Sequence, residues 1–272
     1  GRASMDASTI IVGSQDYYSN EILAEVYAQA LEGSGFQVER QLRIGQREVY
    51  MPEIEAGAID VFPEYTGNLL QYLDQNASAH TSQEVYDALA TALPMGLRAL
   101  DQSPATDQDS YVVTSTFAAE HSVTSIGDLA SLGRPITIAA NSEFTTRPYG
   151  PKGLKAVYGV DASVTPVEDS GGPLTVKALT DGTVDVADIY SSDPAIGAKD
   201  LVILSDPQML ILPQNVTPLV SASLPAIAAT AINRVSALLT PDELRSLNQR
   251  STGEKLSSKT IATDWLTSKK LL

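Results

Sequence analysis

Apolar runs of strand length alternate with amphipathic stretches in the first hundred residues. Thr9–Gly13 is a continuous apolar run, and residues 19–31 then carry Ile22, Leu23 and Val26 at helical spacing. The same patterns predict strands at 36–42 and 58–62, and helices at 48–56, 68–73 and 83–100. The chain therefore opens in the order β-α-β-α-β.

A second alternating series follows the break at Gln102-Ser103-Pro104. It predicts strands at 111–114, 136–139, 163–167 and 184–189, and helices at 126–132, 153–158 and 174–179. Residues 201–212 are predicted to be extended, and three helical patterns end the chain at 225–238, 241–248 and 257–265. We expect two α/β units with mainly parallel sheets, and a final part that returns to the first unit.

Polar and aromatic side chains gather directly after the predicted strands. The residues in such positions are Gln15, Tyr17, Tyr65, Asn68, Arg147 and Tyr190. In α/β proteins the loops at the carboxyl ends of strands carry the functional groups. These side chains are therefore the first candidates for a binding site.

Length and charge narrow the possible partners. The chain has 272 residues with 43% hydrophobic content, enough for one large domain or two smaller ones. Its 18 basic and 33 acidic residues give a net charge of -15, which excludes sequence-independent binding of nucleic acid. Cations and zwitterions are the more natural ligands, although the charge also fits a role in solubility alone.

Absent residue types and segments narrow the picture further. The chain has no cysteine, which excludes disulfides, thiolate metal sites and cysteine nucleophiles. It has no apolar run of the roughly 18 residues that span a bilayer. Gly1–Met5 resembles an added leader ahead of a trimmed start, so we expect that a removed export or lipid-anchor signal would leave no trace.

Tyrosine is the most frequent aromatic residue, with 11 Tyr against 4 Phe and 1 Trp. Tyr17, Tyr65, Tyr111 and Tyr190 lie at or beside predicted strand ends. A quaternary ammonium group has no N–H to donate, so a protein holds it with aromatic faces, at roughly 0.5–2 kcal/mol per contact. These tyrosines suit such a cage, whereas any one of them alone also fits a half-buried framework role.

Arg147 and two amides supply polar chemistry beside these tyrosines. The guanidinium of Arg147, in a loop before Pro148, suits either a ligand carboxylate or a surface salt bridge. Asn68 and Gln15 suit either a ligand carboxylate or hydroxyl, or simple turn positions.

No catalytic constellation accompanies these groups. His80 and His121 lack the spacing of a metal site or a catalytic triad, and no glycine-rich segment matches a phosphate-binding loop. We expect no catalytic residue, no metal and no cofactor.

Four ordered motifs resemble the substrate-binding proteins of osmoprotectant ABC importers, the glycine betaine/choline-binding family of ProX/OpuAC type. The motifs are Ile11–Tyr17, Asp60–Gly67, Glu143–Pro148 with Gly153-Leu154, and Val186–Ser191. The resemblance covers nearly the whole chain.

The resemblance implies the two-lobed, periplasmic-binding-protein-like α/β fold of type II, with two crossing segments and the ligand in the cleft between the lobes. Lobe 1 would comprise residues 6–108 and 205–272, and lobe 2 residues 109–204. Tyr65, Tyr111 and Tyr190 would be walls of the aromatic cage, with Arg147 as the carboxylate clamp. Asn68 and Gln15 would add polar contacts. The further candidates for walls are Tyr17 and Tyr86.

The function implied by this resemblance is that of an extracytoplasmic receptor. It would be a monomer that captures glycine betaine, choline, carnitine or an ectoine-like solute and delivers it to an ABC permease. Gln15 stands where some relatives have lysine and Gln214 where some have tyrosine, which leaves a phenolic ligand open. A two-lobed enzyme, whose cofactor-anchoring cysteine this chain lacks, and a sensory domain are the remaining alternatives.

Overall fold

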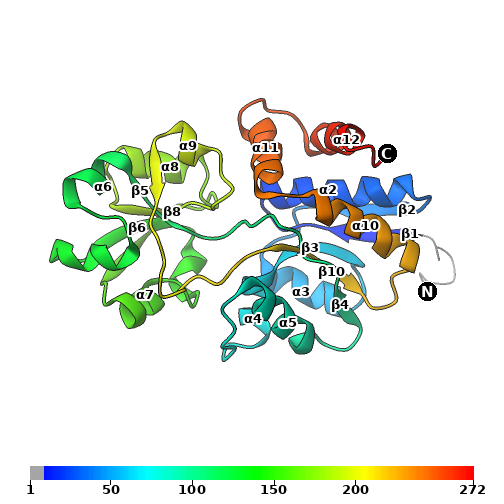
Figure 1. Cartoon of the computed structure of the whole chain (residues 1–272), viewed down its shortest axis with the longest axis horizontal. Coiled ribbons are helices and arrows are strands. Elements are labelled where there is room, and N and C mark those ends of the chain that lie inside the picture. The colour runs from blue at the N-terminus through cyan, green and yellow to red at the C-terminus, as the bar shows by residue number, and fades with distance from the viewer. Residues whose placement is uncertain (1–8) are drawn as a thin grey trace. The chain divides into compact units, whose positions relative to one another are not determined.

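The computed structural model describes residues 9–272 and divides them into two compact units (Figure 1). Unit 1 comprises the described residues up to Thr106 together with Gln214–Leu272, and unit 2 comprises Asp107–Pro213. The chain therefore passes between the units twice. The predictions for Gly1–Met5, and for the start of lobe 1 at residue 6, lie outside the described residues.

Unit 1 is built on a five-stranded sheet of order β2-β1-β3-β10-β4. Its strands are β1 (Thr9–Gly13), β2 (Gln37–Gln41), β3 (Val61–Tyr65), β4 (Leu97–Ala99) and β10 (Val216–Ser221). Strand β1 is parallel to β2 and β3, whereas β10 is antiparallel to β3 and β4. The sheet is therefore mixed rather than mainly parallel.

Strand β10 is absent from the sequence-based prediction because it contains a proline. Pro218 lies directly opposite Pro63 of β3. Neither residue has an N–H to donate, so this pair occupies a position of the antiparallel ladder where the two strands exchange no hydrogen bonds. The backbone groups of each proline therefore face away from the partner strand: the carbonyl oxygen of Pro218 accepts the backbone N–H of Leu100, and that of Pro63 accepts the side-chain amide of Asn20.

Helices cover both faces of this sheet (Figure 1). Ile10 and Val12 of β1 pack on one side and Ile11 on the other, as the alternation of a strand requires. The helices of the first face are α2 (Tyr18–Gly33), α10 (Ala226–Leu238), α11 (Pro241–Thr252) and α12 (Ser258–Ser268). Those of the second face are α3 (Arg47–Glu55), α4 (Thr66–Leu73) and α5 (Ser82–Ala92).

The predicted helix at 83–100 is wrong beyond Ala92. Helix α5 begins with a capping box between Thr81 and Glu84 and ends before Pro94, which has no N–H for helical bonding. Gly96 then adopts a φ of 98°, which glycine tolerates without strain, and β4 begins at the next residue. The proline and glycine therefore convert the end of the apolar pattern into a strand.

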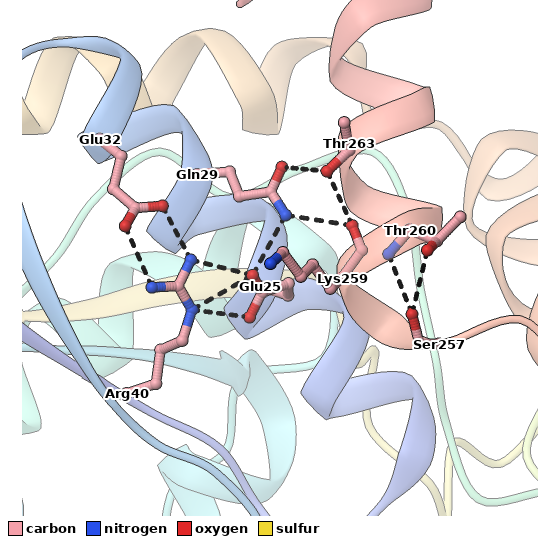
Figure 2. A network of polar contacts seen from close by, with 8 residues as sticks. All are labelled: Glu25, Gln29, Glu32, Arg40, Ser257, Lys259, Thr260 and Thr263. Carbon is pink, nitrogen blue, oxygen red and sulfur yellow. Dashed lines mark hydrogen bonds and ion pairs between the residues drawn. The ribbon is translucent and has the colours of Figure 1, made fainter.

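A polar network ties the C-terminal helix α12 to α2 and β2 (Figure 2). Arg40 of β2 donates to Glu25 and Glu32 of α2 at 2.9 and 2.8 Å. Gln29 of α2 donates to the carbonyl oxygen of Lys259 at 3.1 Å and accepts from the hydroxyl of Thr263 at 2.8 Å. Helix α12 is thereby fixed to α2 in the first unit.

Unit 2 has a second five-stranded sheet, of order β7-β6-β8-β5-β9. Its strands are β5 (Tyr111–Thr114), β6 (Ile136–Ala140), β7 (Ala162–Pro166), β8 (Val186–Asp188) and β9 (Leu201–Ile203). Its helices are α6 (Ser115–His121), α7 (Pro151–Tyr158), α8 (Pro173–Thr180) and α9 (Ala195–Ala198), with short 3₁₀ helices η1 (Ile126–Leu132) and η2 (Ser142–Thr146). Strand β5 is antiparallel to β8 and β9, so this sheet is also mixed.

Residues 205–213 belong to unit 2, whereas the sequence led us to expect the return to lobe 1 at residue 205. Ser205 forms a bridge with Ser125, and Asp206 accepts hydrogen bonds from the hydroxyl of Tyr158 and the backbone N–H of Ile211. These contacts hold the segment against η1 and α7 of unit 2. The second crossing therefore lies at Pro213 and Gln214.

The core of unit 1 predicts a large cost for truncating Leu23. This side chain is fully buried in the cluster formed by α2, α10 and α12. We expect Leu23→Ala to lower the free energy of unfolding by about 2–5 kcal/mol, because it leaves a cavity. Denaturant titration followed by fluorescence of Trp265, the only tryptophan and a residue of this unit, measures the change.

Leu238→Ala is the matched control, because Leu238 of α10 is 40% exposed. It should change the stability of unit 1 far less. Equal losses for the two variants would contradict the packing described here.

Candidate ligand-binding site

The first group of candidate residues lies at the carboxyl ends of β1 and β3 in unit 1. The two strands are parallel neighbours, paired at Val12 and Val61. Gln15 follows β1 within two residues, and Tyr65 is the last residue of β3. The structure therefore brings both residues to the same edge of the sheet.

A buried ion pair lies beneath this edge. The guanidinium of Arg47 donates two hydrogen bonds to the carboxylate of Glu64, each of 2.8 Å. The side chains are only 8% and 0% exposed. The same carboxylate accepts the hydroxyl of Tyr50 at 2.6 Å and the backbone N–H of Tyr65 at 2.9 Å. With four donors, the carboxylate has all of its lone-pair positions occupied.

Asn20, which was not among the candidates predicted from the sequence, links Gln15 to Tyr65. Its Oδ1 accepts the backbone N–H of Gln15 at 2.7 Å. Its Nδ2 donates to the carbonyl oxygen of Pro63 and to the hydroxyl of Tyr65, both at 3.0 Å. The signal in the sequence was an amide in the first turn of an amphipathic helix directly after a strand end, where a buried polar group requires partners.

Asn68 is held by Gln214 through paired amides. The backbone N–H of Asn68 donates to Gln214 Oε1 at 2.8 Å, and Gln214 Nε2 donates to Asn68 Oδ1 at 2.9 Å. Gln214 is fully buried. Because the backbone bond fixes Oε1, the Asn68 amide must turn its Oδ1 to Gln214 and present its Nδ2 donor elsewhere.

Tyr17 and Tyr86, the weaker candidates for cage walls, lie in different settings. Tyr17 directly precedes α2, is 8% exposed, and makes an edge contact with Tyr18 at 5.2 Å between ring centroids. Tyr86 lies on α5, and its hydroxyl donates to the carbonyl oxygen of Leu100 at 2.6 Å, just after β4. Their contact with a ligand stays a prediction.

In unit 2, Tyr111 is the first residue of β5 and is 2% exposed. Its hydroxyl donates to the carbonyl oxygen of Tyr149 at 2.7 Å. Phe144 makes edge contacts with the rings of Tyr111 and Tyr149, at 5.9 and 6.0 Å between centroids. The three rings form a packed aromatic cluster within this unit.

Arg147 follows η2 in a loop whose path depends on glycine. Its backbone N–H donates to the carbonyl oxygen of Phe144 at 3.2 Å, and its carbonyl oxygen accepts from Gly150 at 3.0 Å. A Cβ on Gly150 would lie 2.1 Å from the Phe144 oxygen, and one on Gly153 would lie 2.0 Å from the Pro148 oxygen. Only glycine fits these positions, so the loop that carries Arg147 has a fixed course.

Tyr190 lies close to buried carboxyl groups. Burial raises the pKa of the Tyr190 hydroxyl well above its usual value, and the charges of Asp109 and Asp188 raise it further. Burial also raises the pKa of Asp188, together with the charge and hydrogen bond of Asp109. Tyr190 therefore lies within electrostatic reach of two buried carboxyl groups, Asp109 and Asp188.

The remaining chemistry of the described residues is limited. Residues 9–272 contain no group of three or more His, Cys, Asp or Glu residues placed to hold a metal ion. No helix in this part of the chain is long and apolar enough to cross a membrane.

Solved structures define the fold class as the two-lobed, periplasmic-binding-protein-like α/β fold. A structure titled as a glycine betaine/carnitine/choline ABC transporter superposes with a TM-score of 0.80 at 19% identity, covering 96% of this chain and 99% of that one. The apo structure of YehZ from Escherichia coli gives 0.72 at 27% identity, covering 97% of this chain and 100% of that one. The predicted fold class is confirmed.

The chain belongs to the OpuAC family, described as the substrate-binding domain of ABC-type glycine betaine transport systems, which matches residues 8–268. The glycine betaine-binding protein YehZ of Escherichia coli strain K12 is 28% identical to it over 279 residues, covering 97% of this chain and 91% of that protein. The resemblance identified from the four motifs is therefore confirmed.

The raised pKa of Asp188 predicts the pH dependence of unit 2. The folded pKa lies above the unfolded value of about 3.9, so the folded state binds more protons and its stability falls as the pH rises above about 4. Asp188→Asn, which retains an oxygen for the backbone N–H of Ser110, should flatten this fall and raise stability at pH 7. Calorimetric unfolding between pH 4 and pH 8, as an approximate working range, measures it.

Asp185→Asn is a control of opposite sign. Arg134 lowers the pKa of Asp185. The ionised carboxyl of Asp185 therefore stabilises the folded protein above the unfolded pKa, and this stabilisation is lost as the pH falls. This variant should lose stability at pH 7. A loss of stability in Asp188→Asn at pH 7, with the slope of stability against pH unchanged, would contradict a raised pKa for Asp188.

Proposed function

We propose that the protein is the extracytoplasmic receptor of an ABC importer for a quaternary-ammonium compatible solute of the glycine betaine, choline or carnitine type. The observation that carries this proposal is the edge of unit 1, where Asn20 holds Gln15 and Tyr65 together above the buried Arg47–Glu64 pair. An aromatic ring and oriented amides at a strand end suit a ligand with a methylated cation and a polar end.

The tyrosines are proposed to hold the ammonium group through their ring faces. Tyr65 would contribute from unit 1, and Tyr111 and Tyr190 from unit 2, with Tyr17 and Tyr86 as further walls. The carboxyl groups near Tyr190 and the net charge of -15 support the choice of a cation. Each ring face adds about 0.5–2 kcal/mol, so several faces suffice for tight but reversible binding.

The polar end of the ligand is assigned to Arg147 and Asn68. The fixed loop around Gly150 supports a role for the Arg147 guanidinium as a bidentate carboxylate clamp. The amide of Asn68, turned by Gln214 to present its donor, supports a contact with a carboxylate or hydroxyl oxygen. No bond of the solute is made or broken in this function.

Transport requires a further partner. We propose that the receptor works as a monomer outside the cytoplasm, attached by a lipid anchor, and delivers its solute to the membrane permease. The family match and the names of the relatives, which refer to glycine betaine, carnitine and choline, support this placement.

Loss of the Tyr65 ring should weaken binding of every quaternary amine. We expect Tyr65→Ala to reduce the affinity for glycine betaine and choline about tenfold or more, because an aromatic face is lost. Tyr65→Phe is the matched control, since it keeps the ring and removes only the hydroxyl that accepts from Asn20. Calorimetric titration measures both, and a ligand at about 100 times its dissociation constant adds about 2.7 kcal/mol of stability.

Loss of the Arg147 guanidinium should affect the affinities for glycine betaine and choline differently. Arg147→Met is expected to weaken glycine betaine, which has a carboxylate, far more than choline, which has none. Arg245→Met, at an exposed arginine paired with Asp242 on α11, should affect neither. If no quaternary amine binds the unaltered protein, the proposed function is refuted.

A further inference from the structure

Two buried carboxyl groups of unit 2 lie together at the start of β5. Asp188, the last residue of β8, is 7% exposed, and Asp109, which precedes Tyr111 in the chain, is 8% exposed. Strands β5 and β8 are antiparallel, and Tyr111 pairs with Asp188 across the ladder. The backbone N–H of Ser110 donates to Asp188 Oδ1 at 3.2 Å, and a hydrogen bond joins the two carboxyl groups. Unit 2 therefore assembles this pair from its own strands.

A hydrogen bond between two carboxyl groups requires a proton. An ionised carboxylate only accepts, so two ionised carboxylates have no hydrogen to share and repel each other. The Asp109–Asp188 pair therefore holds one proton and carries one negative charge. Burial and the charge of Asp109 favour this form, because they raise the pKa of Asp188, and Glu143 of η2 raises it further.

The elements around the pair supply mainly acidic and phenolic groups. On α8, which packs beside β8, Lys177 is exposed and pairs with Asp181 at 2.5 Å. Strand β6, the parallel neighbour of β8, has no charged residue. Arg147, on the loop after η2, is assigned above to the polar end of the ligand. The acidic and phenolic groups come from the crossing segment, η2, β5 and the turn after β8, and are Asp107, Glu143, Tyr111 and Tyr190.

Both of the unit 2 tyrosines proposed as cage walls lie within electrostatic reach of the pair. Burial raises the pKa of the Tyr111 and Tyr190 hydroxyls, and the charges of Asp188 and Asp109 raise both further. A cation held on the face of either ring is therefore in the field of the same two carboxyl groups. Its charge favours their ionisation, so the ligand and the shared proton oppose each other.

We propose that the Asp109–Asp188 pair releases its shared proton when a cationic solute binds to the tyrosines of unit 2, so that the receptor exchanges a proton for its ligand. This inference rests on the proposed function and specifies the regulation of the same site. The O–H bond of the pair breaks, its electrons stay on the carboxylate, and the proton passes to water. Capture is therefore weaker in acid and becomes tighter as the pH rises.

Choline measures this exchange, because its ammonium group has no proton to lose. Calorimetric titration in phosphate and in Tris, whose heats of ionisation differ, should show release of about one proton per choline near pH 7. The free protein holds the proton and the complex does not. Between about pH 5 and pH 8 the affinity should therefore rise with pH, by up to about tenfold per pH unit.

Substitution of either carboxyl group should abolish the exchange. Asp188→Asn keeps an oxygen for the backbone N–H of Ser110 but has no proton to release, so choline should bind with an affinity independent of pH. Asp109→Asn should give the same result from the other half of the pair. Asp185→Asn is the matched control, because Asp185 directly precedes β8 and pairs with Arg134 instead. It should keep both the proton release and the slope.

The outcomes separate this inference from the proposed function. Binding of choline to the unaltered protein without proton release overturns the exchange and leaves the proposed function intact. Unchanged release in both Asp188→Asn and Asp109→Asn overturns it as well. Failure of every quaternary amine to bind refutes both.

The shared proton also has a readout that requires no ligand. Near pH 7, the infrared spectrum of the unaltered protein should contain the carbonyl stretching band of a protonated carboxylic acid, because an ordinary aspartate with a pKa of about 3.9 is ionised there. Asp188→Asn should remove this band and Asp185→Asn should retain it. Addition of choline should remove it from the unaltered protein. Absence of the band from the unaltered protein would contradict the shared proton.

Discussion

The burial of the Arg47–Glu64 ion pair is the constraint on which the edge of unit 1 depends. Removing two charges from water costs several kcal/mol per ion, and only excellent geometry and further hydrogen bonds offset that cost. Here the carboxylate accepts four donors, among them the hydroxyl of Tyr50 and the backbone N–H of Tyr65. Each donor is thereby fixed in direction, and so are the groups bonded to it in turn.

The alternation of strands and helices, the family motifs and the candidate residues could be read from the sequence, because period and local chemistry are encoded in neighbouring positions. The hydrogen-bond partners of those residues could not be predicted from the sequence. Arg47 of α3 and Glu64 of β3 come together only in the folded chain. Gln214, which bonds to Asn68, lies 146 residues further along the chain. Strand β10 was missed for a related reason, since Pro218 argues against a central strand and its pairing with β3 and β4 is formed only in the fold.

Similar side chains at strand ends acquire different chemistry from their surroundings. Gln15 and Asn68 are both amides, yet Gln15 donates its Nε2 to Tyr50 whereas Asn68 accepts from Gln214 through its Oδ1. Asp185 directly precedes β8 and Asp188 is its last residue, yet Arg134 lowers the pKa of the first while burial and Asp109 raise that of the second. Composition alone assigns these pairs the same properties.

The position of β10 in the sheet also determines the order in which the protein is completed during synthesis. Unit 2 is a continuous stretch of chain and can fold as soon as Pro213 has left the ribosome. Unit 1 cannot, because β10 lies between β3 and β4, and α12, at the end of the chain, packs on α2. During synthesis the second unit can therefore be complete while the first still has two unjoined strand edges, β3 and β4, which pair only after β10 has been translated.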